Sequence, residues 1–137
     1  MLPALRVVAV LHALSLLLQP ILAGMFLSGH DSAIDSHATN ASILVSLCLV
    51  MTVLAFLAWR RELVPRPVFT VAASMLVAEG LQMMAGYAHL MWMHIPLGVL
   101  LFGALAQLMP QVMRAGRTPK DARPGVSAEP VPAEAAE

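Results

Sequence analysis

The sequence has little charge and few aromatic side chains. Only 12% of its 137 residues are charged and 5% are aromatic, whereas about a quarter of the residues of an average soluble domain are charged. Eight basic residues balance eight acidic ones, so the formal net charge is zero. Outside the loops and the C-terminal segment there is no basic stripe that could follow a phosphate backbone, and a nucleic-acid partner is therefore not expected.

Cysteine is nearly absent as well. The single cysteine, Cys48, lies inside an apolar run, so an intrachain disulfide is excluded and we expect a small buried apolar side chain. No cysteine or histidine spacing typical of zinc sites occurs. The sequence also contains no hydrolase motif, no phosphate-binding loop and no nucleophile paired with a base, so it gives no positive sign of an enzyme.

Long apolar runs dominate what is present, with 59% hydrophobic residues and a mean hydropathy of +0.79. They predict helices over about 6–28, 38–59, 68–88 and 94–113, each near the ~20 residues that cross a bilayer. The predicted fold is an all-α integral membrane four-helix bundle over 1–114, followed by a disordered cytoplasmic tail over 115–137. A cleaved signal peptide is the alternative for the first run, although that run is long and no A-x-A site follows it.

The basic residues predict the orientation. Arg60, Arg61 and Arg66 lie between the second and third helices and four more basic residues follow the fourth helix, while the other two connections have none. Positive loops stay on the cytoplasmic side. We therefore expect a multi-pass protein of a cell membrane, such as a bacterial inner membrane, with both termini cytoplasmic. Its small residues would also permit packing against a membrane protein partner or a second copy.

Polar residues occur within the apolar runs. Glu79 lies near the middle of the third helix, where a carboxylate is costly unless it is paired, and Gln82 follows it on the same face. On the first helix His12 and Gln19 share one face. His12 is the natural partner of Glu79, but an offset of about five residues, or ~7–8 Å, indicates that contact needs a water or a helix tilt. Both a structural pair and a proton path fit this pattern.

Two histidines are candidate cofactor ligands. His37 and His94 each stand at the outer end of a helix, so their rings are expected at a similar depth. Ala41 and Gly98, four residues further on, would leave room beside the rings for a flat ligand. Two imidazoles facing each other across a four-helix bundle can ligate a heme iron from its two axial sides. The pattern thus predicts a bis-histidine heme site on His37 and His94.

Other polar residues near the outer face have different interpretations. Asp35 or Ser36 is expected to cap the second helix, and His89 and Trp92 are expected at the membrane interface. A surface site for a divalent metal is a further alternative, formed by His30, Asp31, Asp35 and His37.

The stretches LQPILAGMFLSG followed by HATNA, and LQMMAGYAHLMWMHIPLGVLLFG, form a faint internal repeat. Over about 18–105 they resemble one four-helix half of the heme A synthase family, in which histidines on the second and fourth helices ligate heme. The resemblance implies ligand roles for His37 and His94 only. The family's catalytic half has a glutamate and an arginine where this chain has Ile34 and Ala38, and its paired loop cysteines and second bundle are missing here. It therefore implies a single heme b rather than heme A synthesis.

Three functions remain open from the sequence. The first is a heme b-binding membrane protein for electron transfer or redox sensing. The second is a non-catalytic membrane subunit or assembly factor without a cofactor. The third is a small proton-coupled transporter that uses Glu79.

Overall fold

The computed structural model describes residues 1–116, which form four α-helices and no strand. They are α1 (Leu2–Leu27), α2 (Ala33–Arg60), α3 (Arg66–Tyr87) and α4 (Met91–Arg114). The all-α, four-helix prediction is thus confirmed. The predicted disordered tail lies, from residue 117 onward, outside the described residues.

All four helices begin earlier than the apolar runs indicated. α1 starts four residues before Arg6, with Pro3 in its first turn, where a missing backbone N–H costs nothing. α2 starts at Ala33, and its N-cap is Ser32, whose side chain makes no capping hydrogen bond. The prediction that Asp35 or Ser36 caps this helix was therefore wrong. Asp35 instead lies in the first turn, where a carboxylate interacts favourably with the helix dipole.

α4 also begins earlier than predicted, at Met91, and contains Pro96 and Pro110. Pro96 consequently lies in the second turn rather than the opening turn. Because proline has no N–H, the carbonyl of Trp92 loses its usual helical donor at this point. His94 then occupies the first turn of α4, as His37 follows the first turn of α2.

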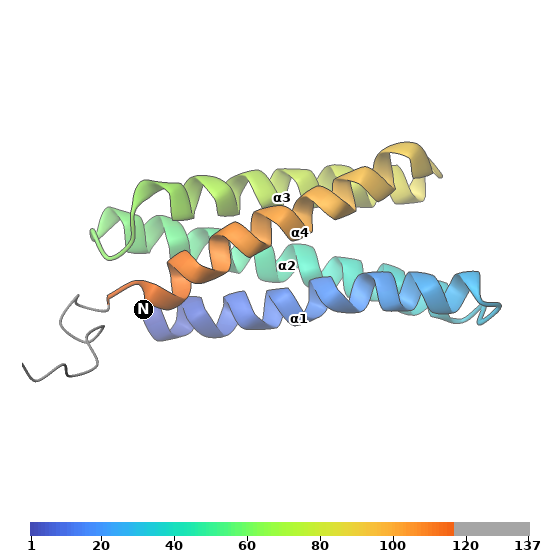
Figure 1. Ribbon diagram of the computed structural model, residues 1–137, viewed down its shortest axis with the longest axis horizontal. Helices are drawn as coiled ribbons and strands as arrows, with labels where there is room; N and C mark the ends of the chain where they lie inside the picture. Colours follow the sequence, from blue (N-terminus) through green and yellow to red (C-terminus); the bar gives the residue numbers. More distant parts are fainter. Residues whose placement is uncertain (117–137) are drawn as a thin grey trace, which may run out of the picture.

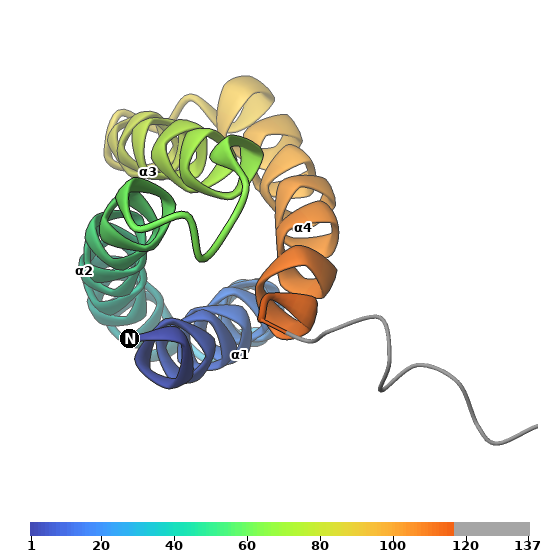
Figure 2. The ribbon, with the colours of Figure 1, turned by 90° about the vertical axis from the view of Figure 1, so that its left-hand side faces the viewer.

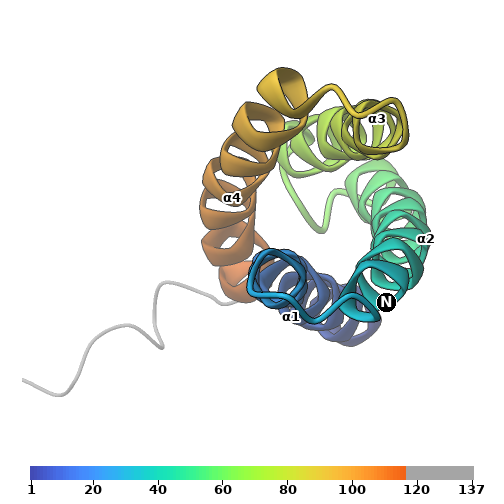
Figure 3. The same ribbon diagram turned by 90° about the vertical axis from the view of Figure 1, so that its right-hand side faces the viewer.

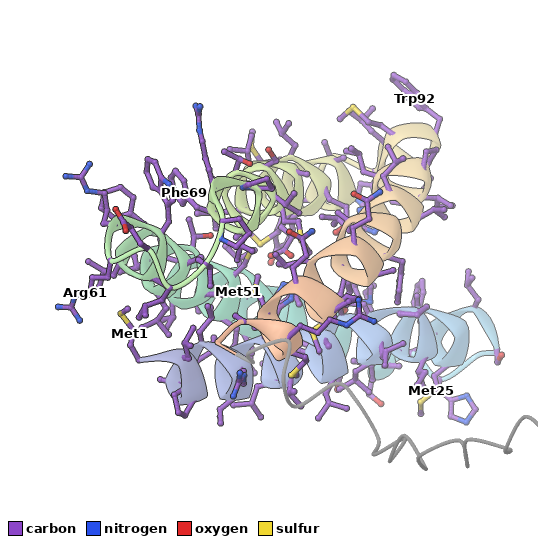
Figure 4. The ribbon with its side chains drawn as sticks, turned by 60° about the vertical axis from the view of Figure 1, so that its left-hand side comes forward. Met1, Met25, Met51, Arg61, Phe69 and Trp92 are labelled. Atoms are coloured by element: carbon purple, nitrogen blue, oxygen red, sulfur yellow. The ribbon has the colours of Figure 1, made fainter. Side chains whose placement is uncertain are left out.

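The helices are arranged in a ring in which each packs against its neighbours in sequence (Figures 2 and 3). α4 crosses the bundle at an angle, beginning beside α3 and ending near the start of α1 (Figure 1). We call the end with the connections 28–32 and 88–90 the hairpin end, and the opposite end the terminal end. Met25 and Trp92 lie toward the hairpin end, and Met1, Arg61 and Phe69 lie toward the terminal end (Figure 4).

Each helix turns one narrow stripe of side chains toward the bundle interior. The buried residues recur every three or four positions, which is the spacing of one helix face. On α2 they are Asn40, Leu44, Cys48, Met51, Ala55 and Ala58, and on α4 they are Leu101, Leu105, Leu108 and Val112. Alanines and other small residues in these stripes let the helices approach closely.

The outward faces are apolar. Many large hydrophobic side chains remain exposed along the helices, including Val77 at 64% and Leu100 at 68%. All four helices are long and apolar enough to cross a membrane. Such a surface would be an aggregation hazard in water but matches the hydrocarbon of a bilayer. The chain is therefore a multi-pass membrane protein.

The three connections share one backbone device. The second residue after each of α1, α2 and α3 has a positive φ: Gly29 (92°), Glu62 (58°) and His89 (57°). In each case the next residue donates its N–H back to a carbonyl five positions earlier, which closes a Schellman-type helix end. His89, expected only as an interfacial residue, thus occupies a position that the turn itself requires.

The terminal end is held by side chains from distant parts of the sequence. The Arg6 guanidinium donates to the carbonyls of Val112 and Ala115, and so supplies donors to the otherwise unpaired C-terminal carbonyls of α4. Trp59 stacks on Phe69 with ring centroids 5.5 Å apart, which joins α2 to α3.

Candidate functional site

Polar residues form two separate layers inside the bundle. The outer histidine pair, His37 and His94, lies toward the hairpin end and comes from α2 and α4. The buried triad comes from α1, α2 and α3 and consists of His12, Cys48 and Glu79.

The rings of the outer histidine pair lie close to each other. Their centroids are 6.1 Å apart and their planes are inclined by 57°. Two nitrogens on opposite sides of one metal ion, each about 2 Å from it, put the ring centroids roughly 6 Å apart. The separation between His37 and His94 is thus the one that a single metal ion between them requires.

Backbone carbonyls fix the orientation of both rings. His37 Nδ1 lies 3.1 Å from the Gln19 carbonyl oxygen, and His94 Nδ1 lies 2.8 Å from the Gln82 carbonyl oxygen. A carbonyl only accepts, so each Nδ1 donates and the lone pair of each neutral ring is on Nε2. Neither Nε2 takes part in a hydrogen bond among residues 1–116. A backbone carbonyl that accepts from the other ring nitrogen is typical of metal-bound histidine.

The two hairpins repeat this contact. In each, the carbonyl of a glutamine on the first helix accepts from a histidine on the second. The glutamine side chains are also placed alike. One terminal atom of the Gln19 amide lies 3.1 Å from the Ala41 nitrogen and the other lies 3.0 Å from His37 Nδ1, and the Gln82 amide lies beside Gly98. Ala41 and Gly98 both stand four residues after their histidine. The faint sequence repeat therefore corresponds to equivalent contacts.

One glycine lies directly against the pair, but it is not the glycine expected. A Cβ added to Gly86 would lie 3.0 Å from His94 Cε1, so the imidazole rests on the bare backbone of α3. At Gly98, the residue expected to make room for a ligand, a Cβ would instead meet Gln82 Nε2 at 2.9 Å. The neighbouring helix, rather than the histidine's own helix, supplies the flat surface.

The side of the bundle between α1 and α4 is the least closely packed of its four sides. The hydrogen bonds that join these two helices, from Arg6, lie at the terminal end. At the hairpin end α4 lies beside α3 (Figure 3), and its outward residues Ile95 and Val99 are 62% and 67% exposed. A planar ligand that reaches the outer histidine pair from the lipid would enter from this side.

In the deeper layer, His12 and Glu79 are in direct contact. His12 Nε2 lies 2.7 Å from Glu79 Oε1, and the two side chains are 0% and 1% exposed. The expected offset of five residues was too large, because α1 begins at Leu2 and not at Arg6. His12 is residue eleven of α1 and Glu79 residue fourteen of α3, so the offset is about 4.5 Å, which side chains can bridge without water.

A second polar contact lies next to this pair along α1. Asn40 donates from Nδ2 to the Ser15 carbonyl at 2.9 Å and accepts from the Ser15 hydroxyl at 2.9 Å. Both residues are buried. Ser15 follows His12 by one turn, so the polar stripe of α1 continues from the triad toward Gln19, whose carbonyl reaches His37.

Cys48 completes the triad, which no pattern in the sequence indicated. One ligand-type atom from each of His12, Cys48 and Glu79 lies within 4.8 Å of the other two. Within the described part of the chain, this is the one group of three or more histidine, cysteine or carboxylate side chains that is close enough to share a metal ion. The surface group of His30, Asp31, Asp35 and His37 is not brought together.

No protein-family model, no curated protein and no solved structure matches the chain.

Proposed function

We propose that the protein is a membrane-bound cytochrome that holds one heme b between His37 and His94. The observation that carries the proposal is the closeness of the two rings at 6.1 Å with both Nδ1 atoms committed to carbonyls. Each Nε2 then presents a lone pair to a metal ion. The resemblance of these stretches to half of a heme A synthase supports the same assignment.

Heme supplies reversible one-electron exchange, which suits electron transfer or redox sensing. The protein's own contribution is to hold the two imidazoles in one tautomer. The Gln19 and Gln82 carbonyls accept from Nδ1, which increases the electron donation of Nε2 and fixes the ring planes. Gly86 lets the His94 ring lie against α3, and the sparsely packed side between α1 and α4 gives a flat macrocycle an approach from the lipid.

The absorption spectrum of the full chain, expressed with heme supply and purified in mild detergent, tests this proposal. We expect a Soret band with the low-spin spectrum of two nitrogen ligands and one heme per chain. His37→Ala and His94→Ala should each lose the low-spin spectrum, whereas His30→Ala, at an exposed histidine of the 28–32 connection, should keep it. Absence of a Soret band, or an unchanged band in the His37→Ala/His94→Ala double variant, would refute the proposal.

The alternatives predict different results in the same preparation. A subunit or assembly factor without a cofactor would be colourless and would copurify with a partner or a second copy. A proton-coupled transporter would lose flux in Glu79→Gln, although Glu79 is fully buried against His12, which does not favour access for a substrate.

The membrane orientation is part of the proposal. Three arginines lie in or beside the 61–65 connection, at the terminal end: Arg60, Arg61 and Arg66. The start of α1 and the end of α4 lie at the same end. We therefore assign the terminal end to the cytoplasm and the hairpin end, with the outer histidine pair, to the outer side of a cell membrane. Membrane-impermeant labelling of single cysteines introduced at Ser28 and at Arg61 would distinguish the two sides.

A further inference from the structure

The contact between His12 and Glu79 leaves other polar atoms of the buried triad without a hydrogen-bond partner. His12, Cys48 and Glu79 are 0%, 0% and 1% exposed, and each comes from a different helix. His12 Nδ1 and Glu79 Oε2 have no hydrogen-bond partner in the described residues. The Cys48 thiol is 3.8 Å from the Ala72 carbonyl, a long contact for its proton.

Such unpartnered atoms are unusual in a buried position, because each has lost the hydrogen bonds that it would make to water. The cost is greater in a membrane protein, whose surroundings supply no water. This carboxylate belongs to a buried group that also contains an imidazole and a thiol, which indicates that a further species binds there.

We infer that the triad is a binding site for one divalent transition-metal ion of the zinc class. Imidazole, thiolate and carboxylate together form the mixed nitrogen, sulfur and oxygen set that zinc accepts in four-coordinate sites. A thiolate ligand disfavours magnesium and calcium, which prefer oxygen alone. The ligand atoms lie within 4.8 Å of one another, somewhat wider than a four-coordinate ion with bonds of about 2 Å needs, so small side-chain rotations would close the site.

The charge balance selects a divalent ion. Binding removes the thiol proton of Cys48, because the thiolate is the metal ligand. The complex of a neutral imidazole, a thiolate, a carboxylate and M²⁺ then carries no net charge. A monovalent ion would leave one negative charge at this depth, which is costly in a low-dielectric interior.

The inference does not rest on heme binding. The triad shares no residue with the outer histidine pair, and His12 precedes Gln19 by seven residues along α1, which is about 10 Å.

Cobalt(II) is the probe for the test, since a thiolate bound to Co²⁺ gives a charge-transfer band in the near ultraviolet. The full chain, treated with chelator in detergent, is titrated with Co²⁺. We expect a band that saturates at one Co²⁺ per chain, release of protons on binding, and displacement by Zn²⁺. Cys48 is the one cysteine in the sequence, so the band reports on this thiol alone.

Variants assign the band to the triad. Cys48→Ser should abolish it while helical circular dichroism is retained, and Glu79→Gln should weaken Co²⁺ binding at least tenfold. The His37→Ala/His94→Ala double variant should bind Co²⁺ like the unchanged chain, whether or not that chain binds heme. No thiolate band at saturating Co²⁺, or Co²⁺ binding lost in the double histidine variant, would overturn the inference.

Discussion

The two polar layers of the bundle are built in opposite ways. In the outer histidine pair each ring is fixed by a backbone carbonyl of its own hairpin, and no hydrogen bond joins His37 to His94. In the buried triad, the His12 and Glu79 side chains contact each other across the diagonal of the ring of helices, from α1 to α3. The outer histidine pair is therefore held by contacts within each hairpin, α1–α2 and α3–α4. The buried triad connects the two hairpins to each other.

This difference separates ligand binding from fold stability. Because the outer pair is held by backbone atoms, loss of a ring there should remove a ligand without separating the hairpins. Because the triad is held side chain to side chain, loss of one member leaves its partner buried and unpaired. Substitutions in the two layers should therefore have different consequences.

The largest effect on stability is expected from Glu79→Leu. In chelator-treated protein it should lower the free energy of unfolding by about 3 kcal/mol, because it leaves the His12 imidazole buried without its partner. Reversible unfolding in mixed detergent measures this loss. The double variant His12→Leu/Glu79→Leu should recover a large part of it, since both polar groups are then gone. Glu62→Gln, at an exposed glutamate, is the control. Losses that simply add in the double variant would contradict coupling between His12 and Glu79.

Gly86→Ala should have the next largest effect and should act on the outer histidine pair. The added Cβ would lie 3.0 Å from His94 Cε1 and 3.1 Å from its Nδ1, so the ring must move away from the Gln82 carbonyl. We expect about 1–2 kcal/mol of lost stability from overpacking, and a heme affinity at least tenfold lower by titration. Gly80→Ala is the matched control, because its Cβ would meet no atom within 4 Å. Equal heme affinities in the two variants would contradict the role of Gly86.

The sequence predicted the fold well because a membrane-spanning helix is a local property. Long apolar runs and basic connections sufficed for four helices, and the period of the polar residues placed Glu79 and His12 inside. The bounds were less accurate, since Arg6 was taken as a helix end although it lies within α1. That error contributed to the overestimate of the offset between His12 and Glu79, which is three residues and not five.

Contacts between helices could not be predicted in the same way. The rotation and lateral order of the helices decide that Cys48 joins His12 and Glu79, and that Gly86, instead of Gly98, supports the His94 ring. A single sequence shows which residues of one helix share a face. It does not show how two helices are rotated relative to each other. The Ser15–Asn40 contact was missed for this reason.

Asn40→Ala tests that contact, which lies between the two layers. It removes both hydrogen bonds to Ser15 and should lower stability by about 1 kcal/mol, the usual scale for polar contacts between membrane helices. Ser15→Ala should cost less, because the Asn40 amide still donates to the backbone carbonyl at position 15. Ser46→Ala, whose hydroxyl bonds only to its own helix at Ser42, serves as the control in the same unfolding assay. An Asn40→Ala loss no larger than that of Ser46→Ala would contradict a link between α1 and α2 here.

Gly98→Ala should have the smallest effect, and it separates the two ways of supporting His94. Its Cβ would lie 2.9 Å from Gln82 Nε2, which is closer than any contact at Gly86. However, that nitrogen is the free end of a flexible side chain, whereas the imidazole beside Gly86 is held by its Nδ1 hydrogen bond. Rotation of the Gln82 amide should relieve the clash, so we expect stability within about 0.5 kcal/mol of the unchanged chain and an unchanged heme spectrum. Gly103→Ala, with no atom within 4 Å of its added Cβ, gives the baseline. The contrary result would be that Gly98→Ala weakens heme binding as much as Gly86→Ala does. In that case the ligand would need the space beside His94 on α4, as the sequence first indicated.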